Sequence, residues 1–480
     1  MDHSQIQLID LIIIIAYLIG MMLIGVFSVR RIKNSKDYYV AGRSFGPIVM
    51  MATVCATIIG GSSMMGRAGL GYTNGIECLM TALPYMIGMF LFSAYAGRIY
   101  DVGSRHGISS IPELFEFRFG KGAKIVSAIM IALAMMGTVA SQVTATATIV
   151  KLLGSQYGIS YELGALIATC IFIVYTGAAG LFGVVYTDVV QFFILTIFVY
   201  FMVPVSSITS LGGLGNFLSN IDTSYLIPKV DGRLLGDIIS YLVITIAGAE
   251  MWQRAFAAKS RKDAKRGMFW GTAVYAVCVS MILVMALAAQ QLLPDVKGTY
   301  GSTDAVIPAL AITTLPAGLT GLALAGILSV MMSTADSYLL VSMQTVVNDI
   351  GKTIKPDMSE KQTLFLSRVM SVVLALSALL IALYVKSAYT ILTTIYNFYA
   401  AAAGIPALAA LYWKKATKQG IISAMVGGFA VCAIWKALGS PFGLGATLPG
   451  ALVCLILLVT VSLATYKKSP SIMPDTSKTA

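Results

Sequence analysis

Charged residues are scarce in this sequence. Only 11% of the 480 residues are Asp, Glu, Lys or Arg, whereas 58% are hydrophobic. A soluble protein would carry roughly twice that charged fraction, so the composition excludes an ordinary soluble domain and predicts an integral membrane protein. Apolar runs such as "LIDLIIIIAYLIGMMLIGVFSV" and "PGALVCLILLVTVSLATY" are long enough to cross a bilayer, because a spanning helix needs about 20 apolar residues.

Histidine and paired cysteines are also lacking. The chain has two histidines, His3 and His106, and its six cysteines show no short paired spacing. These absences exclude a disulfide framework and a clustered metal site, and we expect free thiols and no cofactor. A membrane-embedded enzyme would need a nucleophile with a base, or a metal cluster, within the spans, and the sequence contains neither. We therefore expect a protein that is not an enzyme.

The first apolar run is predicted to remain as a spanning helix. A cleaved signal peptide carries its positive charges before the apolar segment, whereas here Asp2 precedes the run and basic residues follow it. Apolar runs separated by polar breaks predict thirteen spans in total, and the 45 glycines favour tight helix packing in one bundle. The spans are at about 7–29, 45–70, 76–98, 122–151, 160–181, 184–208, 234–256, 267–292, 314–349, 362–385, 387–412, 418–438 and 445–466.

Basic residues divide unequally between the two sides of these spans. If the N-terminus is outside, six basic residues are on the outer side and Arg67 lies within a span, which leaves 26 of the 33 on the cytoplasmic side. This bias predicts a multi-pass protein of the cell inner (plasma) membrane with its N-terminus outside and its C-terminus in the cytoplasm. The basic segment "AAKSRKDAKRG" is then a solvated cytoplasmic loop beside the anionic leaflet, and nucleic-acid binding is not supported.

Two spans contain interruptions. "GGSS", at 60–63, falls near the middle of the second span, and Gly248 with Glu250 beside it interrupts the seventh. Glycine and serine are poor helix formers, so both helices are predicted to break, and a break is tolerated where it lines a site or a water-filled cavity. The second break comes five spans after the first, which is the placement expected in an inverted repeat. Alternatively, the glycines permit close helix contact.

A polar cluster lies in the ninth span. Ser333, Asp336 and Ser337 are at positions i, i+3 and i+4, so they share one helix face, and Thr334 adjoins it. An intramembrane aspartate is costly enough that a functional role is the first hypothesis. The structural alternative is that the hydroxyls bond to their own helix and Asp336 is hydrogen-bonded to a neighbour.

At these residues the sequence resembles the sodium/solute symporter family, which includes bacterial proline and galactose symporters. The resemblance covers nearly the whole chain and depends on five segments in order: "SFGP" with "CATIIGG", "IPELFEFRFG", "GLFGVVYTDVVQ", "QRAFAAKS" and "AGILSVMMSTADSYLL". It implies an all-α polytopic protein with the five-plus-five inverted repeat of the leucine-transporter type. The repeats would be 45–208 and 234–412, between a cytoplasmic loop at 30–44 and peripheral helices with a cytoplasmic tail at 413–480.

The resemblance also implies ion sites. A sodium site between the second and ninth spans would use the carbonyls of Ala56, Ile59 and Val330 and the hydroxyls of Ser333 and Thr334. Oxygen ligands of this kind suit a small hard cation. A second cation site, found in some members, corresponds to Asp188, Asp336 and Ser337 with Ser333. Asp336 departs from the serine expected there, so this site could bind sodium, take a proton or be structural.

The solute is expected near the midplane, beside the first break. The expected contacts are Thr57, Gly60, Gly61, Ser62, Ser63 and Gln142, although Gln142 could instead form an interhelical hydrogen bond. Arg67 could act as an extracellular gate or carboxylate anchor, or its side chain could extend to the membrane interface. Amino acids or short carboxylates are the favoured solutes, and sugars, nucleosides and vitamins remain alternatives.

The resulting hypothesis is sodium-coupled symport of a small polar organic solute into the cell by alternating access. The expected partners are the sodium ion, the solute and the lipid bilayer, and no obligate protein partner is indicated. A transporter-like solute sensor is the alternative, but the short tails leave no room for a signalling module. A channel is disfavoured because no pore loop is repeated.

Overall fold

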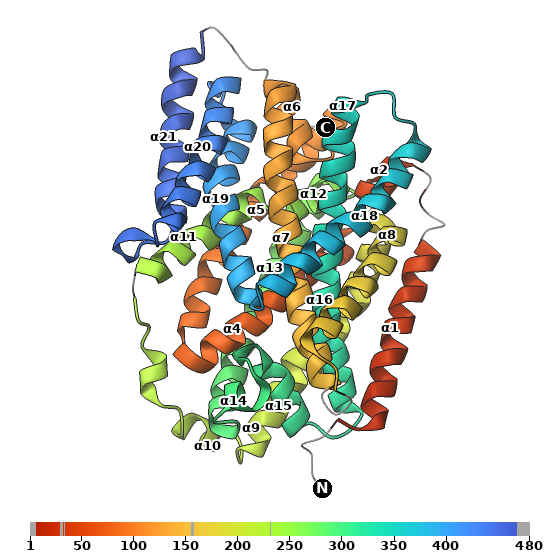
Figure 1. Ribbon diagram of the computed structural model, residues 1–480, viewed down its shortest axis with the longest axis vertical. Coiled ribbons are helices and arrows are strands. Elements are labelled where there is room, and N and C mark those ends of the chain that lie inside the picture. Colours follow the sequence, from red (N-terminus) through yellow and green to blue (C-terminus); the bar gives the residue numbers. More distant parts are fainter. Residues whose placement is uncertain (1–5, 29–31, 33, 155–157, 231, 468–480) are drawn as a thin grey trace.

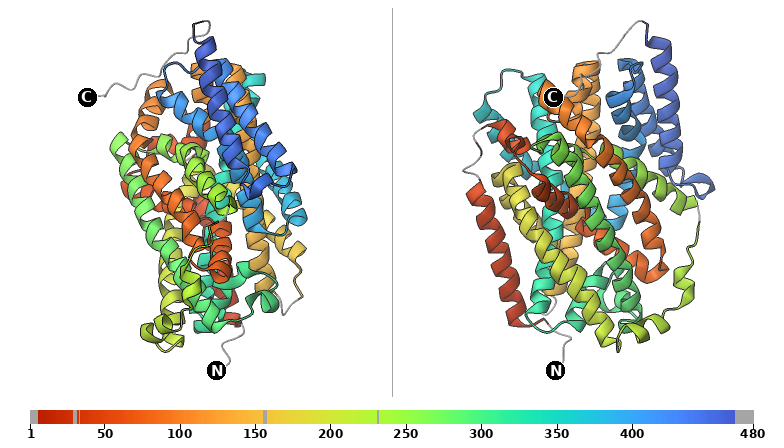
Figure 2. Two further views of the ribbon diagram at one scale, coloured as in Figure 1. Left: turned by 90° about the vertical axis from the view of Figure 1, so that its left-hand side faces the viewer. Right: turned by 180° about the vertical axis from the view of Figure 1, so that it is seen from behind.

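The computed structural model describes residues 6–28, 32, 34–154, 158–230 and 232–467 and is a bundle of helices (Figure 1). Within these ranges the only β-type pairing is an isolated bridge between Phe45 and Ala258. Figures 1 and 2 show α1 (Leu8–Ser28) at one edge of the bundle, and α20 (Lys418–Ala437) and α21 (Thr447–Thr465) at the opposite edge. The all-α prediction is confirmed.

Eleven helical segments of the described chain are long and apolar enough to cross a membrane, or twelve when a bent helix pair is counted as one span. The predicted count of thirteen is therefore not confirmed. The difference is the predicted span at 160–181, because the apolar helix described there, Tyr161–Ile173, is too short to meet this criterion. This helix is the first part of α8 (Tyr161–Ile194), which continues into the sixth predicted span.

The remaining spans are built from further helices, some of them joined end to end. They are α5 (Glu77–His106), α7 (Lys121–Leu153), α8 with the π-helix η4 (Leu195–Met202) and α9 (Val203–Ser210), α11 (Gly232–Ala247) with α12 (Ala249–Ala257), α13 (Arg261–Leu292), α16 (Leu319–Met343) with the π-helix η7 (Gln344–Gly351) and α17 (Lys352–Ile354), α18 (Glu360–Tyr384) and α19 (Ala388–Tyr412).

Short helices cover the two ends of the bundle. At one end are α2 (Ser35–Val40), the 3-10 helix η2 (Ala41–Arg43) and α6 (Ile111–Phe119). At the other are α10 (Leu214–Ser219), the 3-10 helices η5 (Thr223–Leu226) and η6 (Thr303–Ala305), α14 (Val296–Tyr300) and α15 (Val306–Thr314). The 3-10 helix η8 (Pro441–Gly443) joins α20 to α21. Helix α1 begins near the second end and α21 finishes near the first, so the two ends of the described chain lie on opposite sides (Figure 1).

Serine side chains fix the starts of several helices. Ser110, Ser160 and Ser260 accept hydrogen bonds from the backbone N–H three residues later, at 3.2, 3.2 and 3.1 Å, and begin α6, α8 and α13. At α18 the exchange is reciprocal, because Ser359 also donates its backbone N–H to the Gln362 side chain. Such caps satisfy N–H groups that lack a partner within the helix, so helix starts are encoded locally.

Both predicted helix breaks are confirmed. The second predicted span is α3 (Pro47–Ile58) followed by α4 (Gly61–Asn74), with a bend of 52° between them. The seventh is interrupted at Gly248, where ψ is 98°. A third break, at Gly180 inside α8, was not predicted; its φ of 54° lies in the left-handed region that favours glycine. The division into repeats at 45–208 and 234–412 stays a prediction.

Helix α16 lies at the centre of the bundle. Every residue from 323 to 345 is buried, although this segment includes serines, two threonines and an aspartate. It packs against α1, α3, α7, α8 and α18. By contrast, α1 presents exposed Leu8, Ile12, Ile15 and Ile19 at the edge of the bundle, as expected of a helix that faces lipid. The polar face of α16 therefore faces neighbouring helices.

Candidate functional site

The break between α3 and α4 contacts α7 and α16 directly. Gly60 has a φ of +20°, and a Cβ atom there would lie 3.4 Å from Thr334 Cγ2 and 3.7 Å from Gln142 Nε2. A Cβ atom on Gly61 would overlap Met331. Only glycine allows so close an approach of the unwound backbone to two helices. The structure thus brings Gly60, Gly61, Gln142 and Thr334 together, and their roles in binding sodium or solute stay predictions.

The predicted sodium ligands lie around this contact. Ala56 and Ile59 are at the C-terminal end of α3, where carbonyl groups carry the negative end of the helix dipole. Val330 is one turn before Thr334 on α16, and Thr334 Oγ1 is buried without a hydrogen-bond partner among the described residues. Ser333 instead donates its hydroxyl hydrogen bond to Asp188 Oδ1, at 2.5 Å. These five residues stay a predicted sodium site.

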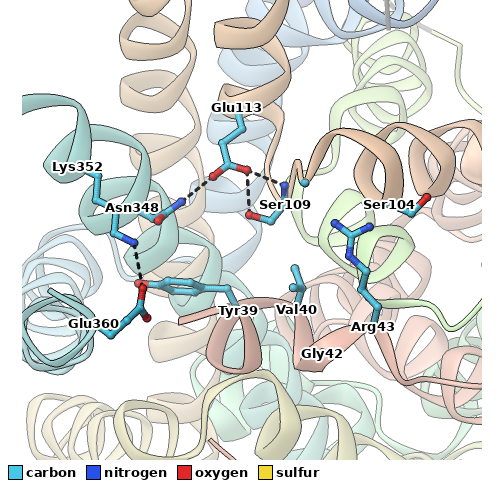
Figure 3. Close-up of a pocket in the computed structure, with 11 residues that line it drawn as sticks. Tyr39, Val40, Gly42, Arg43, Ser104, Ser109, Glu113, Asn348, Lys352 and Glu360 are labelled. Carbon is cyan, nitrogen blue, oxygen red and sulfur yellow. Dashed lines mark hydrogen bonds and ion pairs between the residues drawn. The ribbon is translucent and has the colours of Figure 1, made fainter. Parts of the chain in front are cut away.

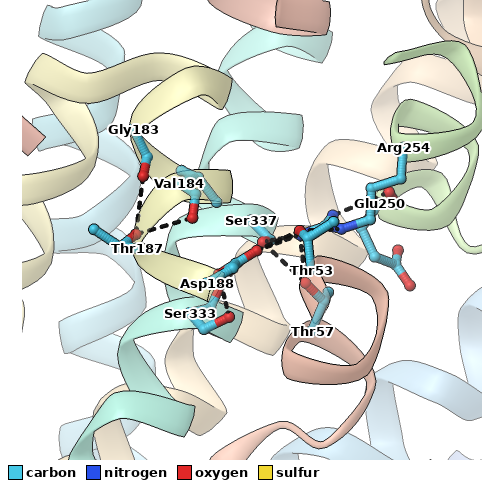
Figure 4. Close-up of polar contacts among 10 residues, drawn as sticks. All are labelled: Thr53, Thr57, Gly183, Val184, Thr187, Asp188, Glu250, Arg254, Ser333 and Ser337. Atoms are coloured by element: carbon cyan, nitrogen blue, oxygen red, sulfur yellow. Dashed lines mark hydrogen bonds and ion pairs between the residues drawn. The ribbon is translucent and has the colours of Figure 1, made fainter. Parts of the chain in front are cut away.

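A buried arginine occupies the predicted second cation site (Figure 4). Arg254, on α12, is fully buried, and its Nη2 atom lies 3.3 Å from Asp188 Oδ2. The same guanidinium donates to the hydroxyls of Thr53, Ser337 and Thr57; the first two bonds are 3.0 and 2.7 Å long. Thr53 also donates to Asp188. We call this group, Thr53, Thr57, Asp188, Arg254 and Ser337, the arginine cluster.

Arg254 was not among the predicted site residues. Its charge was counted with the basic residues of the cytoplasmic side, whereas its side chain is fully buried in the bundle. Trp252, Gln253 and Arg254 are all buried in α12. The available signal was the spacing of Glu250 and Arg254, which are four residues apart and therefore lie on one side of a helix. Arg254 lies two residues before the predicted end of the seventh span at 256, and its charge was therefore counted with the basic loop that follows.

Asp336 does not join the arginine cluster through a hydrogen bond. Its Oδ1 atom accepts from the Thr176 hydroxyl of α8, and its Oδ2 atom is buried without a partner in the described ranges. Ser337 also donates to the backbone oxygen of Ser333, at 2.9 Å, which is the structural alternative considered for these hydroxyls. The three residues predicted for the second site are therefore divided between two groups of contacts.

Arg67 is buried within the bundle. Its exposed fraction is 2%, so extension of its side chain to the membrane interface is wrong. One Nη1 atom donates to Ser63 and, at 2.9 Å, to Tyr275, while the guanidinium lies 5.1 Å from the centre of the Tyr241 ring. Tyrosine hydroxyls and ring faces stabilise a desolvated cation, which explains why this arginine can remain inside. Its roles as gate or carboxylate anchor stay predictions.

The other predicted solute contacts are distributed over this region. Thr57 belongs to the arginine cluster, Ser63 accepts from Arg67, and Gln142 Nε2 lies 3.4 Å from Ser141 Oγ on its own helix. The side chain of Ser62 lies outside the described part of the chain. The solute-binding set is thus grouped along α3, α4 and α7, and each assignment stays a prediction.

A polar cavity of about 570 Å3 opens at the same end as α2, α6 and α17 (Figure 3). Glu113 accepts from the Ser109 backbone N–H at 2.6 Å and from Asn348 at 2.9 Å, which connects α6 to η7. Lys352 lies 3.9 Å from Glu360, and Arg43 donates to the Ile108 carbonyl at 3.1 Å. Because none of its lining residues belongs to either helix break, we do not assign this cavity as the solute site.

Comparisons with known proteins agree on one family. A model of the sodium:solute symporter family matches residues 38–428. The osmoregulated proline transporter OpuE of Bacillus subtilis (strain 168) is 28% identical over 94% of both chains. The sodium/proline symporter of Escherichia coli (strain K12) is 28% identical over 95% of this chain and 92% of its own.

Solved structures share this fold, and one of them matches nearly the whole chain. It is the substrate-bound, outward-open state of a Na+-coupled sialic acid symporter, with a TM-score of 0.81 and 18% identity over 97% of this chain and 99% of that one. The two helix breaks, the buried polar face of α16 and the family match over residues 38–428 lead to one conclusion. This chain belongs to the sodium:solute symporter family.

Proposed function

We propose that this chain moves a small carboxylate-bearing solute into the cell together with sodium, in a ratio of one sodium ion to one solute. The observation that carries this proposal is the contact of the α3–α4 break with α16, where the Thr334 hydroxyl, which has no hydrogen-bond partner among the described residues, faces Gly60. Unwound backbone beside a buried hydroxyl offers oxygen ligands without a full negative charge. That chemistry suits a monovalent ion that must bind and leave in every cycle.

The ratio of one follows from the arginine cluster. Asp188 already has a cationic partner in Arg254, which is part of the protein and cannot be transported. A second sodium ion at Asp188 would have to displace a guanidinium that makes four further hydrogen bonds, to Thr53, Thr57, Ser337 and the Glu250 carbonyl. Buried charge pairs are retained because removal of one partner is strongly unfavourable. Arg254 therefore replaces the second sodium ion.

The carboxylate in the solute follows from Arg67. This buried arginine has an Nε–H without a hydrogen-bond partner among the described residues, and its side chain is in α4 beside the break. Arginine is the side chain best suited to bind a carboxylate through two parallel hydrogen bonds. Proline and sialic acid, the solutes named for the similar proteins, are both carboxylates.

The test is uptake into proteoliposomes that contain the purified protein. Labelled proline, alanine, lactate, pantothenate, glucose and uridine would each be supplied with an inward sodium gradient and with potassium in its place. We expect sodium-driven uptake of at least one carboxylate and no uptake of glucose or uridine. Sodium-independent uptake, or uptake of glucose alone, would contradict the proposal.

A further inference from the structure

Arg67 differs from the other buried basic residues in its partners. The basic side chains that are buried in the part of the chain that the structure describes are Arg67, Arg118, Lys124 and Arg254. Arg254 lies beside the Asp188 carboxylate, and Lys124 forms an ion pair of 2.6 Å with Glu116. Arg118 donates to backbone carbonyls at the C-terminal end of α19, where the helix dipole is negative. Each of these other side chains thus has a source of negative charge.

The described partners of Arg67 carry no negative charge. Its Nη1 atom donates to the hydroxyls of Ser63 and Tyr275, and its guanidinium lies over the ring of Tyr241. These partners reduce the cost of burying the guanidinium, but they offer partial charges only. Arginine cannot lose its proton inside a protein, and a buried full charge without a counter-ion is strongly unfavourable. Among the described residues, the charge of Arg67 is therefore not compensated.

Hydrogen-bond donors without acceptors belong to Arg67 and to the tyrosines that contact it. The Arg67 Nε atom and the Tyr241 hydroxyl are buried without a hydrogen-bond partner in the described ranges. The Tyr275 hydroxyl accepts from Arg67, and no described residue accepts its own hydrogen. Buried donors are normally satisfied, so each unsatisfied one indicates a missing partner. Donors that accompany a positive charge suit an anion, because a charge-assisted hydrogen bond is stronger than a neutral one.

We propose that Arg67, with Tyr241 and Tyr275, binds a chloride ion whenever no solute is bound. A single negative charge neutralises the guanidinium, and a small ion is required because Arg67 is only 2% exposed. Binding of chloride is independent of the proposed function. Its replacement by the solute rests on that function, because the solute carboxylate would use the same Nε atom of Arg67. Chloride and solute therefore compete for one site.

Line broadening in chloride NMR tests this site in the purified full-length protein. Sodium chloride is added to the protein in a non-ionic detergent without solute, and the line width in excess of that of free chloride is recorded. We expect wild type to give an excess line width with a part that saturates as chloride is added. In Arg67→Gln this saturable part should fall at least about tenfold, because the charge and its donors are removed.

Two tyrosine variants provide a matched comparison. Tyr275→Phe removes a hydroxyl that bonds to Arg67 and should weaken chloride binding about threefold to tenfold. Tyr85→Phe should bind chloride as wild type does, because the Tyr85 ring packs 5.9 Å from the Tyr275 ring but its hydroxyl does not bond to Arg67. If Arg67→Gln does not fold, this pair decides, since equal chloride binding in the two variants would overturn the proposal.

Competition separates this inference from the proposed function. Proline, lactate and pantothenate are added to the chloride-bound protein, with glucose as the control, and the carboxylate that is taken up should abolish the saturable line width. No saturable line width in wild type, or an equal one in Arg67→Gln, would overturn the inference and leave sodium-driven uptake intact. Chloride that stays bound beside a transported carboxylate would confirm the anion site and overturn the assignment of Arg67 to the solute. Arg67-dependent chloride binding without sodium-driven uptake of any carboxylate would overturn the proposed function alone.

Discussion

The guanidinium of Arg254 lies 3.3 Å from the carboxylate of Asp188, and both side chains are fully buried. Arg254 comes from α12, after the second helix break, whereas Asp188 comes from α8. The pair therefore joins a segment of one predicted repeat to a helix of the other. Its hydroxyl partners come from α3 and α16, the two helices that border the predicted sodium site.

Removal of the arginine should create a second sodium site. Arg254→Gln leaves Asp188 with the hydroxyls of Thr53 and Ser333 as partners, and a carboxylate with hydroxyls is a sodium ligand set. We expect this variant to lose about 3–5 kcal/mol of stability without sodium, because a buried charge is left unpaired. The dependence of uptake on sodium concentration should become steeper, with a Hill coefficient that rises from about one in wild type toward two in the variant.

The control is the double variant Arg254→Gln/Asp188→Asn. It removes both charges, so its stability should be higher than that of the single variant. The steepness with which uptake depends on sodium concentration should return to that of wild type. Thermal unfolding of the purified proteins at several sodium concentrations measures the first effect, and uptake measures the second. An equal Hill coefficient for sodium in wild type and Arg254→Gln would show that Arg254 does not replace an ion.

The hydroxyls of α16 should differ in their effect on sodium. Thr334→Ala deletes one predicted ligand and should raise the sodium concentration for half-maximal uptake about tenfold. Ser333→Ala should have at least this effect, because it also removes a hydrogen bond to Asp188. Val330→Ala keeps its backbone carbonyl and should change little.

Ser329→Ala is the matched control for these variants. Its hydroxyl is buried on the same helix but donates to the Gly326 carbonyl at 2.6 Å, away from the predicted ligands. If Ser329→Ala raises the sodium concentration for half-maximal uptake as much as Thr334→Ala does, the effect comes from altered helix packing. The sodium assignment would then be wrong at this position.

Asp336 should contribute to structure and not to the number of sodium ions. Its described partner is the Thr176 hydroxyl, and an asparagine oxygen can accept the same hydrogen bond. We therefore expect Asp336→Asn to leave the rate of uptake and the Hill coefficient for sodium unchanged. Asp336→Ala should lower the free energy of unfolding by about 1–3 kcal/mol. A lower Hill coefficient in Asp336→Asn would place a sodium ion at this carboxylate.

One aspartate outside the predicted spans should make stability depend on pH. Burial raises the pKa of Asp304, in η6, to about 6. The folded protein thus binds this proton more tightly than the unfolded chain does, so the stabilisation is complete below about pH 4 and is lost as the pH rises through about 6. The thermal unfolding midpoint should fall by about 2 °C between pH 5 and 7.

Asp304→Asn cannot titrate and should reduce this fall. Asp295 provides the comparison within the same loop, because its carboxylate caps α14 through a 2.7 Å bond from the Gly298 N–H. Asp295→Asn should therefore lower the thermal unfolding midpoint at both pH values, and the fall in the midpoint between pH 5 and 7 should stay as in wild type. A wild-type midpoint that rises from pH 5 to 7, or an Asp304→Asn variant with the full fall, would contradict this account.

Sequence patterns predicted the parts of the structure that local chemistry controls. Glycine pairs and the Gly248–Glu250 interruption identified both breaks, because helix propensity acts within a few residues. The spacing of Ser333, Asp336 and Ser337 likewise predicted a polar face on a buried helix. These features require no knowledge of neighbouring helices.

Features that depend on tertiary contacts were not predicted. Arg254 was counted with the cytoplasmic basic residues, and for Arg67 an interfacial position was one of the alternatives considered. A membrane-buried arginine is stable only with partners supplied by distant segments, which no local pattern shows. Those partners are Asp188, 66 residues before Arg254, and Tyr275, 208 residues after Arg67. The Thr176 partner of Asp336 is likewise 160 residues away, so no local pattern could identify it.

The most direct test of the central claim is the sodium-to-solute ratio, measured from the sodium gradient that balances a fixed solute gradient. Proteoliposomes are prepared with a fixed gradient of the transported solute and the membrane potential clamped at zero, and the sodium gradient at which net solute flux is zero is recorded. With Arg254 in place of a second ion, the account predicts one sodium ion per solute in wild type. A ratio of two would contradict the role of Arg254, and zero flux coupling to sodium would contradict symport itself.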